Sequence, residues 1–514
     1  MDFFHKLLNF YNLDEKGYAE FSAPFSFSDI PDISNFECVK KAIARLEEAK
    51  ERNEKVLIYG DYDCDGVMAA SISKMALNEF GLQAEAYLPS RYMDGYGLTV
   101  ANAEKIVKSY DLILTVDNGV TANEAIEVAY QNNVDVIVLD HHSYEKEPEH
   151  IVSLIHPLTV GLSNPSISAG FLSYLFSVAL LNKQDAYREM LGATSLLSDA
   201  MEITSYNRKA VGLAIELWKE NGNIAFERLI KSEKIDENVI SMQVVPAINS
   251  IGRMNTGNKI NRLIKYFTNP NGDEASIIAN WMLDKNKERK DLVQATASSI
   301  TYDLDKPSVL VKSNLPEGIN GLLANKILDK VNRTVAVYAP SEKGEGLLVG
   351  SMRSKDGCPL TDFIKEVQPM LVAGGGHAFA AGFTIKEEDL PAFGKALNTY
   401  CADKPFNNEN KETIELSLDE ITMDNYKILR SFGPFGQGHH SPLFSLKIEA
   451  DRLLFSPDGT RLQTYIGPSA RIFSFNIKRD DVPQFGEVTL NFELNLNVFR
   501  GRETVSADVS DIIC

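Results

Sequence analysis

The sequence predicts a multidomain α/β protein with a parallel-sheet domain, a long linking helix, a smaller α/β domain and a C-terminal β domain. Its 514 residues are too many for one hydrophobic core, so two to four domains are expected. Short apolar strands alternate with helical segments in the N-terminal part, which is typical of a parallel sheet. Segments of alternating polarity, such as EVTLNFELNLNVF, occur near the C-terminus and indicate antiparallel strands.

The N-terminal part is expected to begin with a helical segment and to continue as the parallel sheet. The stretch ECVKKAIARLEEAKERN has alternating charge on an amphipathic face, which indicates a helix near residue 50. Apolar runs predict strands at residues 56–59, 84–89, 111–119 and 134–142. Helices are expected between the strands, one of them with a capping box formed by Thr121 and Glu124.

Acidic residues and histidines occur at the carboxyl ends of three of these strands. They are Asp61, Asp63 and Asp65 after the first strand, Asp117 in the third, and Asp140, His141 and His142 in the fourth. The carboxyl ends of parallel strands line the ligand crevice of an open sheet, so these side chains are expected to meet. Clustered carboxylates repel one another and raise their own pKa values unless a cation lies among them. The pattern therefore predicts a metal site.

The motif D-x-D-x-D-G that begins at Asp61 has more than one interpretation. Residues two apart point the same way in extended backbone, so the three aspartates are expected to converge on one point. A solvated acidic loop is the alternative. A calcium-binding EF-hand loop is excluded, because its twelfth position needs a glutamate and here holds Ile72, and because a strand precedes the motif.

The middle of the chain is expected to be helical and to lead into the linking helix. Residues 168–235 are helix-rich in pattern, and Asp199 lies there in an apolar stretch, where it needs a partner unless it caps a helix or is exposed. The segment VVPAINSIGRMNTG at 244–257 is expected to form a loop. A long charged segment at 271–301 predicts the linking helix.

A second α/β unit is expected after the linking helix. Its predicted strands lie at residues 307–312, 334–339 and 346–354. A run of three glycines at 374–376 precedes His377. Consecutive glycines allow backbone N–H groups to converge on an anion, and a tight turn is the alternative. A polar linker is expected at 403–412, before the β domain.

The composition narrows the class of protein. The formal charge of -19 argues against coating nucleic acid by bulk charge, although a locally basic groove remains compatible with it. The five cysteines are scattered and form no C-x-x-C pair, which fits a reducing cytoplasm and gives no support to a zinc site or a disulfide framework. No apolar run approaches the roughly 20 residues needed to cross a bilayer, so a cytoplasmic protein is expected.

A series of motifs occurs in a fixed order along the chain: YGDYDCDG, LPSRYMDGYGL, TVDNG, LDHH, PAINSIGR, GSMRS, GGGHAFAAG and PFGQGHHSP. This order resembles that of the DHH superfamily of phosphoesterases, and specifically of RecJ-type single-strand-specific exonucleases. The resemblance covers about residues 50 to 514. It departs at His156, Ser250 and His439, where the family usually has Asn, Ala and Asn, and these changes bear on substrate preference more than on metal binding.

The resemblance implies a domain plan and a metal centre. The implied domains are an N-terminal helical segment 1–50, a DHH domain 51–270, the linking helix 271–301, a DHHA1 domain 302–402 and an OB-like β-barrel 413–514. The implied ligands of two divalent cations are Asp63, Asp65, Asp117, His141 and Asp199, with Asp61 as a further candidate. A mixed carboxylate and imidazole set suits Mn²⁺ better than Mg²⁺, although both are possible, and zinc is the competitor.

The resemblance also implies catalytic and substrate-binding residues. His142 is expected beside the scissile phosphate, and Asp140 is expected to orient the neighbouring imidazole. The implied phosphate-binding residues are Arg91, Asn249, Arg253, Ser351, Arg353, Gly375, Gly376 and His377. In the OB-like domain the expected single-strand-binding residues are Phe473, Phe475 and Phe499 with Arg471, Lys478 and Arg500, although phenylalanines in a small barrel are usually core residues.

The implied function is a 5′→3′ exonuclease that is specific for single-stranded DNA. It would release 5′-mononucleotides by two-metal hydrolysis in DNA repair or recombination, as a cytoplasmic monomer that works with a helicase or a single-strand-binding protein. One alternative is a phosphodiesterase for short oligonucleotides or cyclic dinucleotides. An alternative of another class is a non-catalytic scaffold that binds single strands.

Overall fold

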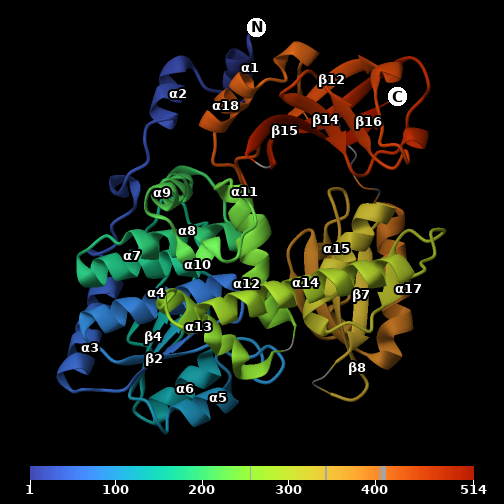
Figure 1. The fold of residues 1–514 in the computed structure, drawn as a ribbon. Helices are drawn as coiled ribbons and strands as arrows, with labels where there is room; N and C mark the ends of the chain where they lie inside the picture. Colours follow the sequence, from blue (N-terminus) through green and yellow to red (C-terminus); the bar gives the residue numbers. More distant parts are fainter. Residues whose placement is uncertain (255, 342–343, 405, 407–411, 500, 514) are drawn as a thin grey trace.

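The chain folds around three sheets. The computed structural model describes residues 1–514 except 255, 342–343, 405, 407–411, 500 and 514, so most of the linker expected at 403–412 falls outside the described residues. The long helix α14 (Ala275–Ser299) connects the first sheet with the second (Figure 1). The third sheet lies above the other two in Figure 1, next to the N-terminal helices α1 and α2. The predicted multidomain α/β architecture with a linking helix is confirmed.

The first sheet consists of five parallel strands in the order β2-β1-β3-β4-β5. Their bounds are β1 Val56–Tyr59, β2 Ala84–Tyr87, β3 Leu112–Val116, β4 Asp135–Leu139 and β5 Ser153–Ile155. Strands β1 and β3 are buried along their whole length, as expected when helices cover both faces of a sheet. The first four agree with the predicted strands. Strand β5 was not predicted, because three residues are too short a run to differ from an apolar loop.

Helices cover both faces of the first sheet. One face carries α3 (Glu37–Glu51), α4 (Cys64–Phe80) and α7 (Ala169–Leu181), and the other carries α5 (Val100–Ile106) and α6 (Asn123–Gln131). Ile58 belongs to the first of these cores and its neighbour Tyr59 to the second, because successive side chains of a strand point to opposite faces. The carboxyl ends of the strands are therefore the free edge on which a site can form.

The capping box predicted at Thr121 is wrong. Helix α6 begins at Asn123, and its N-cap residue Ala122 makes no side-chain cap bond. The segment before α6 is instead fixed to the neighbouring strand end, because the N–H of Val120 donates to Asp140 Oδ2 at 3.0 Å.

A layer of helices follows the first sheet. Its members are α8 Ala186–Ser198, α9 Ser205–Asn221, α10 Ile224–Glu227, α11 Glu237–Val239, α12 Val245–Arg253 and α13 Arg262–Thr268. The loop predicted at 244–257 is wrong over most of its length, because α12 occupies it. Val245, Ile248 and Ile251 are three residues apart and buried, so they form the apolar face of this helix. Pro246 is tolerated because it lies at the start of the helix.

The second sheet has five strands in the order β6-β7-β8-β10-β9. Its strands are β6 Val309–Lys312, β7 Val335–Pro340, β8 Leu347–Arg353, β9 Leu371–Gly376 and β10 Ala380–Lys386, and its helices are α15 Asn320–Val331, α16 Leu360–Glu366 and α17 Leu390–Ala402. The predicted strands correspond to β6, β7 and β8. The glycine run is the edge strand β9, paired with β10, so the tight-turn alternative is wrong, and its contact with an anion stays a prediction.

The third sheet has six strands in the order β11-β12-β15-β16-β14-β13. Its elements are β11 Thr413–Glu415, α18 Met423–Ser431, β12 Leu443–Glu449, β13 Leu462–Tyr465, β14 Ala470–Ser474, β15 Glu487–Phe499 and β16 Arg502–Ile513. Most pairs are antiparallel as predicted, but β11 with β12 and β14 with β16 are parallel. The described pairs form one continuous sheet, and closure into a barrel stays a prediction.

The N-terminal helices belong to the third sheet rather than to the first. Helix α1 (Phe3–Phe10) buries Phe3 and Leu7 in the core of the third sheet, and α2 (Glu15–Phe21) follows it. Arg208 of α9 then bridges the two parts: its guanidinium lies 3.4 Å from the ring centroid of Phe21 and donates to the carbonyl oxygen of Gly433 at 2.5 Å. The N-terminal helices α1 and α2 therefore lie with the third sheet above the first sheet (Figure 1).

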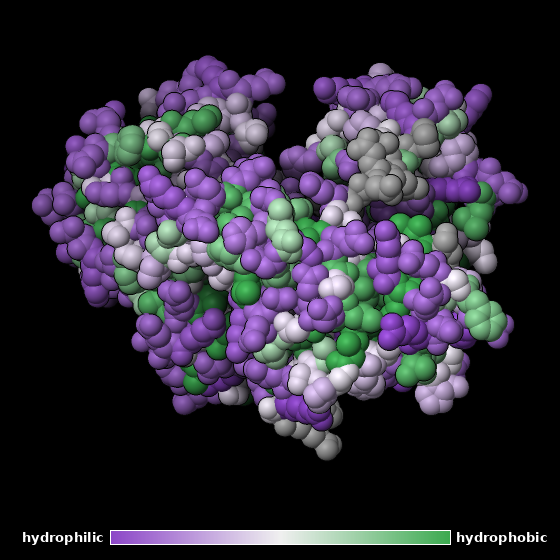
Figure 2. Space-filling view, turned by 90° about the horizontal axis from the view of Figure 1, so that it is seen from above, coloured by the Kyte–Doolittle hydropathy of each residue, from purple (hydrophilic) through white to green (hydrophobic). Residues whose placement is uncertain are grey.

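The surface is predominantly hydrophilic on the face shown in Figure 2, with apolar residues scattered among polar ones. Among the described residues, no helix is long and apolar enough to span a bilayer.

Candidate metal centre and phosphate-binding residues

The acidic motif after β1 turns directly from strand into helix. Asp63 is the N-cap of α4 and accepts a hydrogen bond from the N–H of Gly66 at 3.1 Å, and Asp65 lies in the first helical turn. A Cβ on Gly66 would lie 2.6 Å from the backbone of Asp61, so the turn requires glycine there. The backbone is not extended through the motif, so the expectation that the three aspartates converge on one point is wrong.

The aspartates instead enter adjacent groups of side chains that could each hold a cation. Ligand atoms lie within 4.8 Å of one another in three groups, which are Asp61 with Asp63 and Asp117, Asp117 with His141 and His142, and Asp65 with His141 and Asp199. Asp117 and His141 each belong to two groups, so they occupy the centre of the arrangement. All the implied ligands are thus brought together, from the ends of β1, β3 and β4 and from the C-cap of α8.

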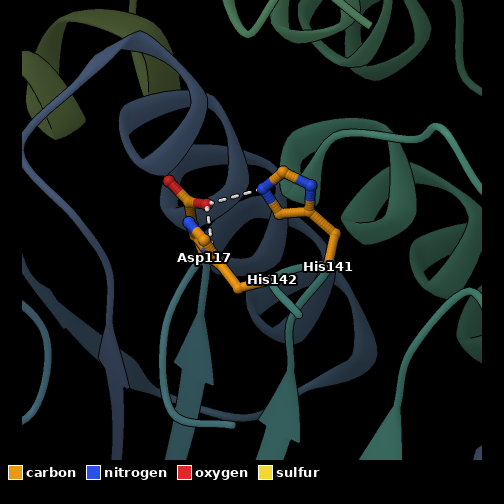
Figure 3. Close-up of side chains that lie close together, drawn as sticks. All are labelled: Asp117, His141 and His142. Atoms are coloured by element: carbon orange, nitrogen blue, oxygen red, sulfur yellow. Dashed lines mark ion pairs between the residues drawn. The ribbon is translucent and has the colours of Figure 1, made fainter. Parts of the chain in front are cut away.

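The clearest indication of a cation is the Nε2 atom of His141. It is buried and has no hydrogen-bond partner among the described residues. Carboxylate oxygens of Asp117, Asp199 and Asp65 lie 3.3, 3.5 and 3.6 Å from it. Ligand atoms that are each about 2.1 Å from one ion lie about 3 Å apart, so this spacing and this donor set fit a divalent cation. Figure 3 shows Asp117 directed at both histidines.

The electrostatics of the cluster lead to the same conclusion. Burial and then the neighbouring Asp63 raise the pKa of Asp61 to about 8 and that of Asp199 to about 7. Burial and then other carboxylates raise the pKa values of Asp65 and Asp117 well above the ordinary value. Burial and then the charge of His142 lower the pKa of His141 to about 4. A divalent cation would relieve the repulsion and favour the ionised carboxylates with a neutral imidazole.

Backbone contacts hold two of these aspartates, one by its carboxylate and the other by its main chain. Both oxygens of Asp65 accept hydrogen bonds from the start of α7, from Ala169 N at 2.8 Å and Gly170 N at 2.6 Å. Asp117 has a φ of 62°, a conformation that is unfavourable for a residue with a side chain, and its N–H donates to Leu139 O at 3.1 Å. Such local strain is characteristic of functional sites.

His142 lies beside the cluster and is oriented by Asp140. Its Nδ1 is 2.8 Å from Asp140 Oδ1, which also accepts the backbone N–H of His141 at 2.8 Å. Burial by itself would lower the pKa of His142, but the hydrogen bond and charge of Asp140 together with the charges of Asp199 and Asp65 outweigh it and raise the pKa to about 9. The Nε2 of His142 lies 3.0 Å from the hydroxyl of Tyr96. Asp140 therefore orients His142, and the side chain of His142 remains 42% exposed.

Three of the expected phosphate-binding arginines lie close together. Burial and then repulsion by Arg91, with a further contribution from Arg353, lower the pKa of Arg253 to about 10. The guanidinium of Arg91 lies 4.6 Å from the ring centroid of Tyr62, and its buried Nε has no partner among the described residues. None of these arginines forms an ion pair with a described carboxylate, so an anion is the group that would neutralise them.

The second sheet offers an open face next to Arg353. Ser351 of β8 pairs with Gly382 of β10, which pairs with Gly375 of β9, so the three residues lie abreast on one face. A Cβ on Gly375 would have no atom within 4 Å. Gly376 follows in the same strand, and His377 is exposed beyond its end. This arrangement gives a ligand access to the backbone, although by a strand rather than by a loop.

Asn249 has a structural contact that the sequence did not indicate. Its Oδ1 accepts the backbone N–H of Cys64 at 2.7 Å, so the side chain fixes α12 to the acidic motif. Two further residues were missed. Tyr96 lies within a quoted motif and contacts His142, whereas Arg289 of α14 lies near Arg253 and resembled an ordinary charged helix residue.

The expected residues of the third sheet are partly exposed. Phe475 is 71% exposed and makes an edge contact with Phe473 at 4.6 Å between ring centroids. The guanidinium of Arg471 lies 4.4 Å from the ring centroid of Phe473. Lys478 caps a short helical turn. The side chain of Phe499 and the whole of Arg500 lie outside the described residues.

Three family models match consecutive parts of the chain. They are the DHH family, N-terminal domain, at residues 55–197, the DHHA1 domain at 306–403, and the RecJ OB domain at 413–511. Together they include the strand ends of the metal centre, the glycine strand and the third sheet.

Several characterised proteins are similar over much of the chain. The single-stranded-DNA-specific exonuclease RecJ of Bacillus subtilis is 28% identical over 81% of this chain, which spans 55% of that protein. The RecJ of Escherichia coli is 26% identical, with 92% of this chain and 90% of that protein aligned. The solved structure of Thermus thermophilus RecJ with Mn²⁺ has a TM-score of 0.83 at 21% identity, covering 100% of this chain and 76% of that one. At this identity the structural likeness establishes the fold.

Proposed function

This chain is a RecJ-type member of the DHH family, and on that premise we propose that it is a metal-dependent exonuclease that degrades single-stranded DNA from the 5′ end. One observation carries the proposal: the buried, unpartnered Nε2 of His141 has three carboxylates around it, next to arginines that lack an acidic partner. Cations and phosphate groups together satisfy both sets of charges, and a phosphodiester strand supplies the phosphates.

We assign the binding of divalent cations to the clustered side chains. Asp61, Asp63, Asp65, Asp117, His141 and Asp199 would hold them. When bound, the cations would supply positive charge that polarises the scissile phosphate and activates a water molecule. The chain's own contribution is to fix the ligands through the backbone contacts of Asp65 and Asp117.

His142 would act on the substrate directly. Asp140 fixes its Nδ1, so its Nε2 is the ring atom left to contact a substrate. Tyr96 occupies the hydrogen-bonding position at Nε2 and would give it up to a phosphate or leaving-group oxygen. In this position His142 can stabilise negative charge or donate a proton to the leaving group.

The remaining residues would hold the strand. Arg91, Arg253 and Arg353 have the planar paired donors that suit phosphate, and Ser351 with the glycine strand would leave room for the terminal nucleotide. The exposed Phe475 with Phe473 and Arg471 would stack bases and contact phosphates farther along. We further propose that the protein acts as a cytoplasmic monomer, supplied with single strands by a helicase or a single-strand-binding protein.

Product analysis tests the proposal. A 30-nucleotide single strand, labelled at either end, is incubated with Mn²⁺ or Mg²⁺, and with Asp65→Asn as the control variant. Immediate release of 5′-mononucleotides from the 5′ end, lost in the variant, is expected. Cleavage of very short oligonucleotides alone would support a small-substrate phosphodiesterase instead, and binding without cleavage would support a scaffold.

The identity and number of the metal ions form a separate part of the proposal. The carboxylate and imidazole donors favour Mn²⁺ over Mg²⁺, and the shared positions of Asp117 and His141 favour two ions per chain. Equilibrium dialysis with Mn²⁺ should give two bound ions, and Mn²⁺ should support faster cleavage than Mg²⁺ at equal concentration. A single bound ion, or faster cleavage with Zn²⁺, would contradict this part.

A further inference from the structure

The linking helix α14 carries two polar residues in its buried stripe. Met282, Asn286, Arg289 and Val293 follow one another at helical spacing and lie on one face of the helix. Met282, Asn286 and Val293 are 0%, 7% and 8% exposed, and Arg289 is half-buried. Stripes of this kind are normally apolar, so a polar pair in the middle of one requires a reason.

The polar pair lies where the two α/β parts meet. Met282 belongs to the core of the first sheet, and Val293 packs against Met254 and Ile319, which lead from α12 and into α15 respectively. Met254 directly follows Arg253. A Cβ on Gly318 would lie 2.7 Å from the carbonyl oxygen of Arg253, so the start of the second α/β part contacts the end of α12. Arg289, one turn before Val293, therefore faces the same junction as Arg253.

The guanidinium of Arg289 is held by an amide instead of a carboxylate. Its Nε and one terminal nitrogen donate to Asn286 Oδ1 at 3.1 and 2.7 Å. Two other buried arginines have acidic partners, since Arg45 pairs with Glu54 and Arg188 with Glu79. A third, Arg208, donates to backbone carbonyl oxygens instead. Among the described residues Arg289 has no such partner. An amide orients a guanidinium without neutralising it, so the full positive charge remains available at the junction.

We propose that Arg289, oriented by Asn286, is a further phosphate-binding residue at the junction it shares with Arg253, so that the linking helix takes part in binding the strand. The inference rests on the proposed nuclease function for the identity of the anion. It adds to the arginines named above a contact that comes from neither α/β part but from the helix between them. Asn286 is then a positioning residue.

Binding measurements on the full-length chain test the inference. The probe is a fluorescent, 5′-phosphorylated oligo-dT of 12 nucleotides, bound by the cleavage-deficient Asp65→Asn protein at several salt concentrations. Arg289→Gln should weaken binding by about tenfold and reduce the slope of log affinity against log salt by about 0.7, the value for one phosphate contact on a single strand. Lys287→Ala and Lys290→Ala, exposed on the same helix, should change affinity by less than twofold.

Asn286→Asp separates a binding role from a structural one. The aspartate keeps the hydrogen bonds to Arg289 and forms an ion pair, so thermal stability should be equal or higher. Binding should nevertheless weaken as in Arg289→Gln, because the guanidinium is neutralised. Wild-type affinity and an unchanged salt slope in both variants would overturn the proposal. If Arg289→Gln proves unstable, the same result in Asn286→Asp alone would overturn it.

A second probe keeps this inference distinct from the nuclease proposal. Tripolyphosphate should raise the melting temperature of the wild-type chain, and Arg289→Gln should reduce that increase. If the wild type cleaves no DNA but shows this difference, the anion site stands and the nuclease proposal fails. If the wild type cleaves DNA and Arg289→Gln leaves both DNA binding and the tripolyphosphate effect unchanged, the role of Arg289 fails alone.

Discussion

The proposed metal centre and the arginine cluster are built in opposite ways. The carboxylates and histidines come from strand ends of one sheet and from the end of α8, and backbone contacts hold them. The arginines come from a loop, from α12, from the linking helix and from the second sheet. The carboxylate and histidine cluster thus depends mainly on the fold of one sheet. The arginine cluster depends on how the two α/β parts are positioned relative to each other. We therefore expect mutations in the first group to lower mainly kcat and mutations in the second to lower mainly the affinity for the strand.

The largest effect should come from Asp117, the carboxylate shared by two of the ligand groups. Asp117→Asn should reduce kcat by more than about a thousandfold, beyond the ten- to hundredfold loss typical of a residue that only orients a ligand. Strand binding should stay within about threefold of wild type, because the arginines are untouched. Single-turnover cleavage and fluorescence anisotropy measure the two effects. Glu124→Gln, at an exposed position of α6, is the control, and an equal loss of binding would contradict the separation.

A smaller effect on kcat is expected from His142 and from Asp140, which orients it. His142→Ala should lower kcat by about 10²- to 10⁴-fold, the usual contribution of a general acid or base. Asp140→Asn should cost about ten- to a hundredfold, because it misorients His142 without removing it. Bound Mn²⁺, measured by dialysis, should persist in Asp140→Asn. Loss of the metal in that variant would make Asp140 part of the metal centre itself.

Substitutions in the arginine cluster should weaken strand binding and leave the binding of metal unchanged. Arg253→Ala should weaken strand binding by about tenfold and reduce the salt slope by about 0.7 to 1, because one phosphate contact is lost. Mn²⁺ binding should not change. Affinity titrations at four salt concentrations give the slope. An unchanged slope would mean that Arg253 serves to join α12 to the second α/β part and does not contact phosphate.

The smallest effect concerns stability without metal. Acids whose folded pKa is raised, such as Asp61 at about 8 and Asp199 at about 7, oppose folding increasingly as pH rises toward those values. His142, raised to about 9, stabilises the fold below its ordinary pKa and loses that contribution over the same range. The melting temperature in EDTA should therefore fall by roughly a few degrees when the pH is raised from 6.5 to 8.

Mn²⁺ should reduce that pH dependence, because the ion keeps the carboxylates ionised and paired. Asp61→Asn in EDTA should reduce it as well, since one raised carboxyl is removed. Differential scanning fluorimetry at fixed ionic strength measures both. A melting temperature that rises with pH in EDTA would show that repulsion among the carboxylates does not limit stability.

The sequence by itself determined the architecture and which side chains most of the proposed metal centre would use. The strands that deliver Asp61, Asp117 and His141 are short apolar runs, and the acidic or imidazole residues follow them directly. Because the carboxyl ends of parallel strands must share one edge, predicting the strands was enough to bring those side chains together. At these strand ends the local sequence pattern also fixes the position of the side chains in the fold, so the sequence was sufficient to predict that they meet.

Only the tertiary structure decided how these side chains are distributed among the three ligand groups and which arginines lie near them. Asp61 and Asp65 enter different ligand groups, and Gly66 lies tightly against the backbone of Asp61, which a side-chain pattern does not reveal. The segment with Arg253 is a helix, and the glycine run is an edge strand, because packing partners far along the chain override weak local preference. Arg289 became a candidate for the same reason: its charge acts on Arg253 only because α14 packs against α12.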